Sequence, residues 1–249
     1  GAVYYFHSNG SYRIEEIVKP RLAHCFFEWN YIADVNSTLN NESVRSVRVS
    51  LGEMLAEEFN PSDVNFVTYL PRCPETAARS YASKIGIEFI EVFYKMRRER
   101  SFLGSTKDER AYSINNNLHL LPGIEQIIEG KNLIVVDDST IRGNNALRAI
   151  NLLKERGRIN KVYLANYTPS IGVIGSDGIP RGCLFGVDMP PNDDFIIRKG
   201  SLEEISNEIG AQIFYLSVDG MLKAFENVGF NRESLCTYCI GGKHPFQDI

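Results

Sequence analysis

Short apolar runs alternate with amphipathic stretches through the middle of the chain. The run Leu133-Ile134-Val135-Val136 is continuous and apolar, which is typical of a strand buried on both faces of a parallel sheet. Apolar residues then recur at helical spacing as far as Gly157, at Ala146, Ala149, Ile150 and Leu153. The pattern predicts a buried strand followed by an amphipathic helix.

The same alternation holds on both sides of this unit. It predicts strands over residues 65–70, 87–93 and 161–166, and a helix over residues 75–85 that ends at Gly86. Strand–helix–strand repetition predicts an α/β fold with an open parallel sheet flanked by helices.

The two ends of the chain follow different patterns. The pattern predicts a ribbon or linker over residues 1–24 and the main domain over residues 25–249. The last part, residues 202–249, adds a helix with Leu202, Ile205 and Ile209 on one side, a strand near residues 213–216, a second helix and an irregular tail. There is no internal repeat.

Composition narrows the class of protein. Of 249 residues, 43% are hydrophobic and 23% charged, as in ordinary globular domains. The formal net charge of −4 argues against a nucleic-acid partner, and no apolar run reaches the ~18 residues of a membrane span. The first twenty residues are too polar for a signal peptide, and five cysteines suit a reducing compartment. We expect a cytoplasmic protein.

The most informative stretch follows the apolar run at residues 133–136. Two adjacent carboxylates, Asp137 and Asp138, are followed by a polar loop with one glycine, Gly143, which opens a helix. A helix N-terminus can bind a phosphate, and carboxylates can hold sugar hydroxyls and, through water, Mg²⁺. The pattern fits a phosphorylated sugar, although a strand end with solvated acids and an N-capping serine is the simpler alternative.

The stretch Val135-Val136-Asp137-Asp138-Ser139-Thr140-Ile141-Arg142-Gly143 resembles the phosphoribosyl-pyrophosphate (PRPP) motif of type I phosphoribosyltransferases. It is most similar to the form V-D-D-S-I-V-R-G-T-T of amidophosphoribosyltransferases. Flanking segments resemble that family in the same order: residues 25–28, 129–131 and 204–220. The resemblance spans residues 25–249 and implies a type I phosphoribosyltransferase fold.

The resemblance implies a PRPP-binding glycosyltransferase that makes phosphoribosylamine from PRPP and ammonia in purine biosynthesis. Asp137 and Asp138 would hold the ribose hydroxyls and the water shell of Mg²⁺. Lys95, Arg97 and Arg100 would cover the pyrophosphate, with Arg72 also offering charge. The 5′-phosphate would lie on Ser139, Thr140, Ile141, Arg142, Gly143, Asn144 and Asn145. We expect PRPP or a purine nucleotide as ligand and a homo-oligomer as the assembled form.

Four of the five cysteines occupy informative positions. Cys236 and Cys239 form a C-x-x-C pair, which by itself fits a zinc site, a redox pair or two buried small side chains. One branch of the amidophosphoribosyltransferases binds a [4Fe–4S] cluster through four cysteines, and Cys25, Cys183, Cys236 and Cys239 fill the corresponding motifs. The resemblance therefore implies a cluster, with Cys73 outside it. A redox pair would need a helix starting at Cys236, which Gly241-Gly242 and Pro245 disfavour.

The chain also departs from the family. The pyrophosphate loop P-x-P-D-S-G reads Leu70-Pro71-Arg72-Cys73-Pro74 here, so it lacks the glycine and offers a thiol, a poor ligand for Mg²⁺. The segment that resembles the glutaminase domain is confined to residues 1–17, so we expect dependence on free ammonia or on a glutaminase partner. A non-catalytic iron–sulfur homologue that binds PRPP or a nucleotide as a regulator or subunit is the alternative.

Overall fold

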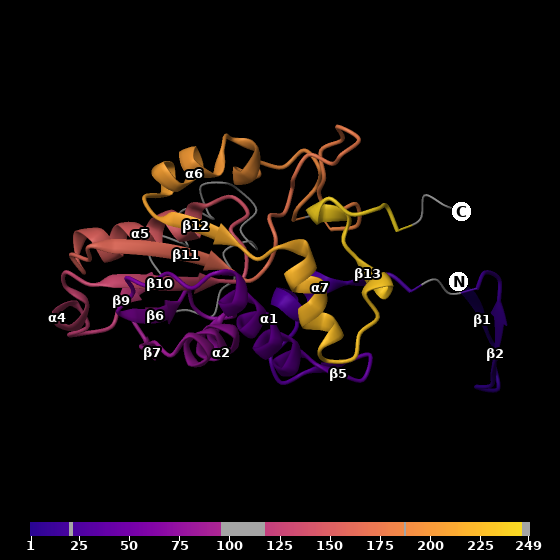
Figure 1. Cartoon of the computed structure of the whole chain (residues 1–249). Coiled ribbons are helices and arrows are strands. Elements are labelled where there is room, and N and C mark those ends of the chain that lie inside the picture. The colour runs from indigo at the N-terminus through magenta and orange to yellow at the C-terminus, as the bar shows by residue number, and fades with distance from the viewer. Residues whose placement is uncertain (20–21, 96–117, 187, 246–249) are drawn as a thin grey trace.

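The fold is built on a five-stranded parallel sheet, seen in a computed structural model that describes residues 1–19, 22–95, 118–186 and 188–245. The strands lie in the order β12-β11-β10-β6-β7 (Figure 1). Their bounds are β6 Phe66–Tyr69, β7 Glu88–Phe89, β10 Asn132–Asp137, β11 Lys161–Asn166 and β12 Gln212–Tyr215. The predicted α/β class and parallel sheet are confirmed.

Helices cover both faces of this sheet (Figure 1). One face packs on α1 (Val44–Glu58), α2 (Glu75–Ile85) and α7 (Val218–Glu226), and the other on α5 (Asn144–Glu155) and α6 (Leu202–Ile209). The short α4 (Glu125–Ile128) precedes β10. Residues of β10 from Leu133 to Val136 are fully buried, as a strand between two helical layers must be.

Smaller elements surround the main sheet in the described residues. Four two-stranded pairings accompany the main sheet: β1 (Ala2–Phe6) with β2 (Tyr12–Glu16), β3 (His24–Cys25) with β13 (Leu235–Cys236), β4 (Thr38–Leu39) with β5 (Glu42–Ser43), and β8 (Phe93–Lys95) with β9 (Leu118–Leu120). Short helical turns are η1 (Glu28–Ile32, π-type), η3 (Ile196–Arg198), η4 (Arg232–Ser234) and η5 (Tyr238–Ile240).

The prediction of one strand over residues 87–93 is wrong. The chain leaves the main sheet after β7, and Phe93 begins β8 in a separate antiparallel pair. Both segments are rich in β-branched and aromatic residues, so the sequence pattern does not mark the break.

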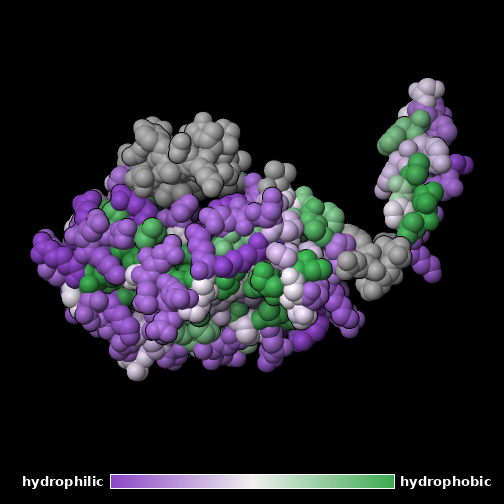
Figure 2. Space-filling model, turned by 90° about the horizontal axis from the view of Figure 1, so that it is seen from above, coloured by the Kyte–Doolittle hydropathy of each residue, from purple (hydrophilic) through white to green (hydrophobic). Residues whose placement is uncertain are grey.

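The predicted ribbon at the N-terminus is the antiparallel hairpin β1–β2, which stands apart from the main body (Figures 1 and 2). All its residues are exposed, including the large apolar side chains Val3, Tyr4, Tyr5, Phe6, Tyr12 and Ile14. Among the described residues, no helix is long and apolar enough to cross a bilayer.

The packing of α1 on α2 depends on Gly52. A Cβ atom at this position would lie 2.2 Å from the carbonyl oxygen of Ala77 in α2. In an open helix, glycine-to-alanine replacement stabilises by about 1 kcal/mol. Here we expect the opposite sign: Gly52→Ala should lower the free energy of unfolding by about 2 kcal/mol through overpacking. Urea unfolding measures it, with Ser46→Ala on the exposed side of α1 as control. A stabilised Gly52→Ala variant would contradict this packing.

Candidate functional site

The strand order determines where a ligand is expected. Numbered along the chain, the five parallel strands lie in the order 2-1-3-4-5, so the direction of winding reverses between β6 and β10. In open α/β sheets, ligands bind beyond the carboxyl ends of the strands at this reversal. β10 ends at Asp137, and the loop after β6 contains Arg72 and Cys73. The acid pair and the loop with Arg72 and Cys73 therefore follow the two strands between which a ligand is expected.

The two carboxylates of the acid pair, Asp137 and Asp138, are 6% and 8% exposed. Burial, and then the neighbouring charge of Asp138, raise the pKa of Asp137 well above its ordinary value. Burial also raises the pKa of Asp138 to about 6. The Ser139 hydroxyl donates to Oδ1 of Asp138 at 2.8 Å and partly opposes this rise. A bound cation or sugar hydroxyl would relieve this unfavourable burial of charge.

The two members of the acid pair face different surroundings. Asp138 interacts with Arg48 of α1, whereas Asp137 lies near Tyr215 of β12. Lys95, at the end of β8, interacts with both carboxylates. Burial lowers the pKa of Lys95, and the two acids oppose that shift. The structure thus brings the predicted Lys95 to the acid pair.

The loop after the acid pair leads into α5 through Gly143. This residue is the N-cap of α5 with φ 85°, a left-handed conformation that favours glycine, and a Cβ atom there would lie 2.5 Å from Cδ1 of Ile196. Asn144 and Asn145 are exposed in the first turn. The first-turn N–H groups of this helix offer a positive dipole end to an anion.

Two side chains of this loop are turned toward the protein. The Thr140 hydroxyl donates to Asn166 Oδ1 at 2.7 Å, and the Tyr215 hydroxyl donates to the Thr140 carbonyl at 3.2 Å. Arg142 forms an ion pair with Asp193 and also donates to the Asp188 carbonyl. These residues contribute by shaping the loop. Asn166, which the sequence reasoning missed, was detectable as a polar residue ending the apolar strand 161–166.

The loop after β6 is anchored inward through Cys73. Its thiol lies 3.3 Å from the Asn30 carbonyl oxygen and 3.5 Å from the Tyr167 hydroxyl, and burial raises its pKa to about 12. Arg72 is exposed and donates to the Lys95 carbonyl at 3.5 Å. The other two basic residues predicted for this side, Arg97 and Arg100, lie outside the described residues.

The four motif cysteines gather at a second place. Cys25 lies directly opposite Cys236 in the parallel pairing of β3 with β13. Cys25 is exposed as a residue, but desolvation of its thiol raises its pKa to about 11, with smaller contributions from Cys236 and Cys183. Burial is the main cause that raises the pKa of Cys239 well above its ordinary value, and the other three thiols add to this rise. Four cysteines from three distant parts of the chain thus form one thiol group.

Backbone N–H groups directed at these cysteines partly oppose the rise in pKa of Cys25 and Cys236. Backbone N–H groups of Phe27 and Glu28 are directed at Cys25, that of Tyr238 at Cys236, and that of Gly186 at Cys183 Sγ at 3.0 Å. Such N–H bonds accompany metal-bound sulfur. Around one zinc ion, four sulfurs would lie about 3.8 Å apart. In the described part of the chain, no three His, Cys, Asp or Glu side chains are placed to hold a single metal ion.

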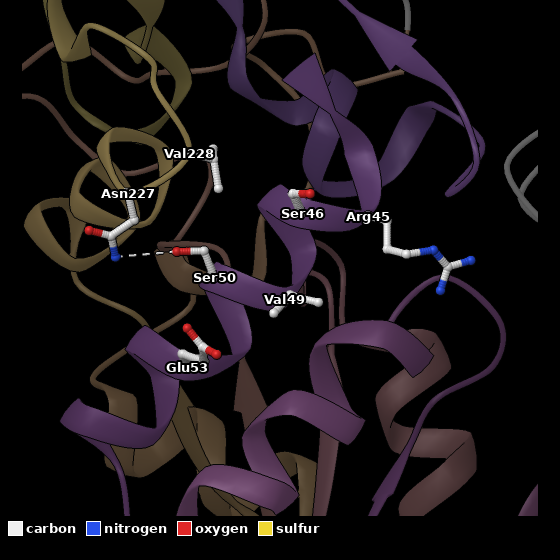
Figure 3. Close-up of a pocket in the computed structure, with 7 residues that line it drawn as sticks. All are labelled: Arg45, Ser46, Val49, Ser50, Glu53, Asn227 and Val228. Atoms are coloured by element: carbon white, nitrogen blue, oxygen red, sulfur yellow. Dashed lines mark hydrogen bonds between the residues drawn. The ribbon is translucent and has the colours of Figure 1, made fainter. Parts of the chain in front are cut away.

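A separate pocket of about 350 Å³ lies between α1 and the residues after α7 (Figure 3). It is lined by Arg45, Ser46, Val49, Ser50, Glu53, Asn227 and Val228. None of the residues predicted from the sequence to bind a ligand or metal lines it. Its inner wall is closed by a hydrogen bond from Asn227 to Ser50 of 3.3 Å.

Comparison with known proteins identifies similar chains. The chain is 33% identical over 225 residues to the amidophosphoribosyltransferase of Methanocaldococcus jannaschii, covering 90% of this chain and 44% of that one. It is 31% identical over 224 residues to the Bacillus subtilis amidophosphoribosyltransferase, again covering 44% of the relative. The chain spans about half the length of the curated relatives it matches. A scan against protein-family models gives no match.

Solved structures agree with the sequence comparison. The structure of an allosteric regulatory enzyme of purine biosynthesis superposes with a TM-score of 0.77 at 28% identity, covering 98% of this chain and 51% of that one. The glutamine PRPP amidotransferase of B. subtilis, solved with ADP and GMP, gives a TM-score of 0.76 at 28% identity, with 98% and 52% covered.

Proposed function

Because the chain is homologous to amidophosphoribosyltransferases over their phosphoribosyltransferase half, we propose that it binds PRPP with Mg²⁺ and transfers the phosphoribosyl group to ammonia. One observation carries the proposal: a buried acid pair lies beside a helix N-terminus at the point where the sheet reverses its winding. That arrangement suits a sugar that carries a phosphate at one end. A purine nucleotide would bind in the same place through its own 5′-phosphate.

Each part of PRPP has a matching surface. The 5′-phosphate would lie on the backbone of residues 139–145, and the ribose hydroxyls on Asp137 and Asp138. The pyrophosphate would face Arg72 and Lys95, together with Arg97 and Arg100. Lys95 interacts with both members of the acid pair, so it lies where the sugar and the pyrophosphate would meet.

The proposed reaction is a displacement at the anomeric carbon of PRPP. The nitrogen of ammonia forms the new C–N bond, the C–O bond to pyrophosphate breaks, and its electron pair leaves with pyrophosphate. The amine then loses one proton to water. The chain would contribute by holding the sugar in place and by placing cationic groups beside the leaving group. Ammonia would come from solution or from a glutaminase partner.

Magnesium fits the acid pair. Two carboxylates and no further acidic ligand are available there in the described residues, and Mg²⁺ characteristically keeps several waters and binds one or two carboxylates plus phosphate oxygens. When bound, the ion would neutralise charge on the pyrophosphate. Asp137 and Asp138 would hold its water shell.

The thiol group also suits a [4Fe–4S] cluster, which takes four thiolates. Support comes from the gathering of Cys25, Cys183, Cys236 and Cys239 and from the N–H groups directed at three of them. A Cβ atom at Gly186 would lie 3.1 Å from Cys183 Sγ, so glycine leaves room beside this sulfur. The cluster would clamp the tail to the segment that enters the domain.

The second candidate function is binding without turnover. It is favoured by the loop after β6, where the Cys73 side chain points into the protein and Pro74 has no N–H to offer a pyrophosphate. None of the five cysteines is in a disulfide, which suits the reducing, cytoplasmic location that we propose for either function.

Isothermal titration with PRPP and Mg²⁺, followed by a pyrophosphate-release assay with ammonium, tests the proposal. We expect magnesium-dependent binding and release of pyrophosphate that rises with ammonium concentration. Binding without release would favour the second candidate function. Absence of binding in the anaerobically purified protein would contradict both.

A further inference from the structure

The π-helical turn η1 presents carbonyl groups that side chains from three other elements bind. The Glu28 carbonyl accepts from the N–H of Ala33, which closes the turn. Arg48 of α1 donates to the carbonyls of Trp29 at 2.9 Å and Ala33 at 2.8 Å. The Tyr31 carbonyl accepts from Arg48 at 3.4 Å and from the Cys73 thiol at 3.7 Å. The Asn30 carbonyl accepts from side chains near the acid pair.

Tyr167 and Cys73 meet at the Asn30 carbonyl. The Tyr167 hydroxyl donates to this oxygen at 2.7 Å, the Cys73 thiol lies 3.3 Å from it, and the thiol and hydroxyl are 3.5 Å apart. The Asn30 side chain also donates to the Thr168 hydroxyl at 2.9 Å. The end of β11 therefore holds Asn30 by both its main chain and its side chain.

These contacts cross the strand that carries the acid pair. β10 lies between β11, which precedes Tyr167, and β6, which precedes Cys73 (Figure 1). The N–H of Tyr167 donates to the Asp137 carbonyl at 3.2 Å, and that of Leu70 to the Val136 carbonyl at 2.9 Å. The Tyr167–Cys73–Asn30 contact therefore connects the loop after β6 to the end of β11, which lies on the other side of the strand that carries the acid pair.

We propose that Tyr167 is a positioning residue that fixes the loop of residues 71–74 relative to the acid pair. This inference rests on the proposed function, because it assigns that loop to the pyrophosphate end of the ligand. Tyr167 is fully buried, so it touches no ligand itself. It acts through Cys73, whose neighbour Arg72 is exposed and donates to the carbonyl of Lys95, the residue that interacts with the acid pair.

The test compares two ligands in Tyr167→Phe, which removes only the hydroxyl. A buried hydrogen bond of this kind is worth up to about 1.5 kcal/mol, or roughly tenfold in affinity. We expect the Kd for PRPP with Mg²⁺ to rise fivefold to tenfold. The Kd for ribose 5-phosphate, which has no pyrophosphate, should change less than twofold.

Tyr81→Phe is the matched control. Tyr81 is also fully buried, and its hydroxyl donates to the Phe59 carbonyl at 2.8 Å, with no contact to the crevice. We expect a similar fall in melting temperature in both variants but no change in either Kd for Tyr81→Phe. If Tyr167→Phe weakens both ligands equally, or neither, the positioning role is wrong.

Cys73→Ala gives a second measurement should Tyr167→Phe fold poorly. It should show the same selective loss of PRPP affinity, whereas Cys73→Ser, which keeps a donor, should recover most of it. In the double variant, the loss should be smaller than the product of the single losses, since both act through one contact. Wild-type protein that binds neither ligand would overturn the proposed function together with this inference. Wild-type binding without selective loss overturns the inference alone.

Discussion

Replacing both carboxylates, in Asp137→Asn/Asp138→Asn, should remove PRPP binding and at the same time stabilise the unliganded protein. Each carboxylate would accept charge-assisted hydrogen bonds from ribose hydroxyls or magnesium-bound water, so their loss should cost a factor of about 100 or more in affinity. Titration calorimetry measures the affinity. Unchanged affinity in the double variant would contradict the assignment of the site.

The gain in stability follows from the raised pKa of Asp138. Its pKa of about 6 in the folded protein lies above the ordinary value of 3.8, so the folded state favours the protonated form. Below pH 4 the protonated Asp138 carboxyl imposes no cost on the folded state. As the pH rises through 6, the buried carboxyl ionises and the folded state loses stability relative to the unfolded state. At pH 7 the double variant should therefore be more stable than the wild type by up to about 3 kcal/mol, and below pH 4 the difference should vanish.

Asp63→Asn is the control with the opposite sign. Asp63 is an exposed residue that precedes β6 in the chain. A hydrogen bond from the Tyr163 hydroxyl lowers its pKa most, and Lys161 lowers it further. Its replacement should slightly destabilise the protein at pH 7 and leave PRPP binding unchanged. A double variant that melts below the wild type at pH 7 would contradict the electrostatic account of the acid pair.

Replacing any one of the four gathered cysteines by serine should remove the iron–sulfur cluster. Protein purified without oxygen should be brown, with broad absorbance near ~400 nm and about four irons per chain. Cys183→Ser should lose most of this iron and absorbance, because the cluster requires four thiolates. Cys73→Ser is the control within the same chain and should keep the iron. A single zinc ion, or wild-type protein without iron after anaerobic reconstitution, would contradict the cluster.

Loss of the cluster should also release the tail. Leu235 and Ile240 are buried against the core, so the tail has some apolar packing besides the thiols. We expect limited proteolysis after residue 235 to accelerate in Cys183→Ser while the body stays intact. Equal cleavage rates in Cys183→Ser and Cys73→Ser would show that apolar packing alone holds the tail.

The regular part of the fold was predictable because local patterns dominate it. The apolar run of β10 and the amphipathic spacing of α5 mark these elements without tertiary information. Helix α1 was missed because Arg48, Ser50 and Gly52 lie on its buried side and break the periodicity. Arg48 is polar because it donates to carbonyls of η1, and Gly52 is small because the α2 backbone lies against it.

The candidate site was predictable in its residue types and less so in its contacts. The acid pair and Gly143 stand in a local motif, so a sequence reading finds them. Asn166, Tyr167 and Arg48 reach the site only through pairings between distant segments, which no local pattern records. The grouping of the four cysteines came from the resemblance, since spacing alone left zinc and redox chemistry open.

The pairing of β3 with β13 has a consequence for the unfolded chain. It joins residues 24–25 to residues 235–236, so nearly the whole domain lies within a single loop closed at its two ends. The entropy lost on closing a loop grows only slowly with the length of the loop. A covalent or metal crosslink between these two ends would lower the conformational entropy of the denatured chain by the equivalent of roughly 5 kcal/mol. A bond between Cys25 and Cys236 would therefore resist unfolding even though it touches little of the hydrophobic core.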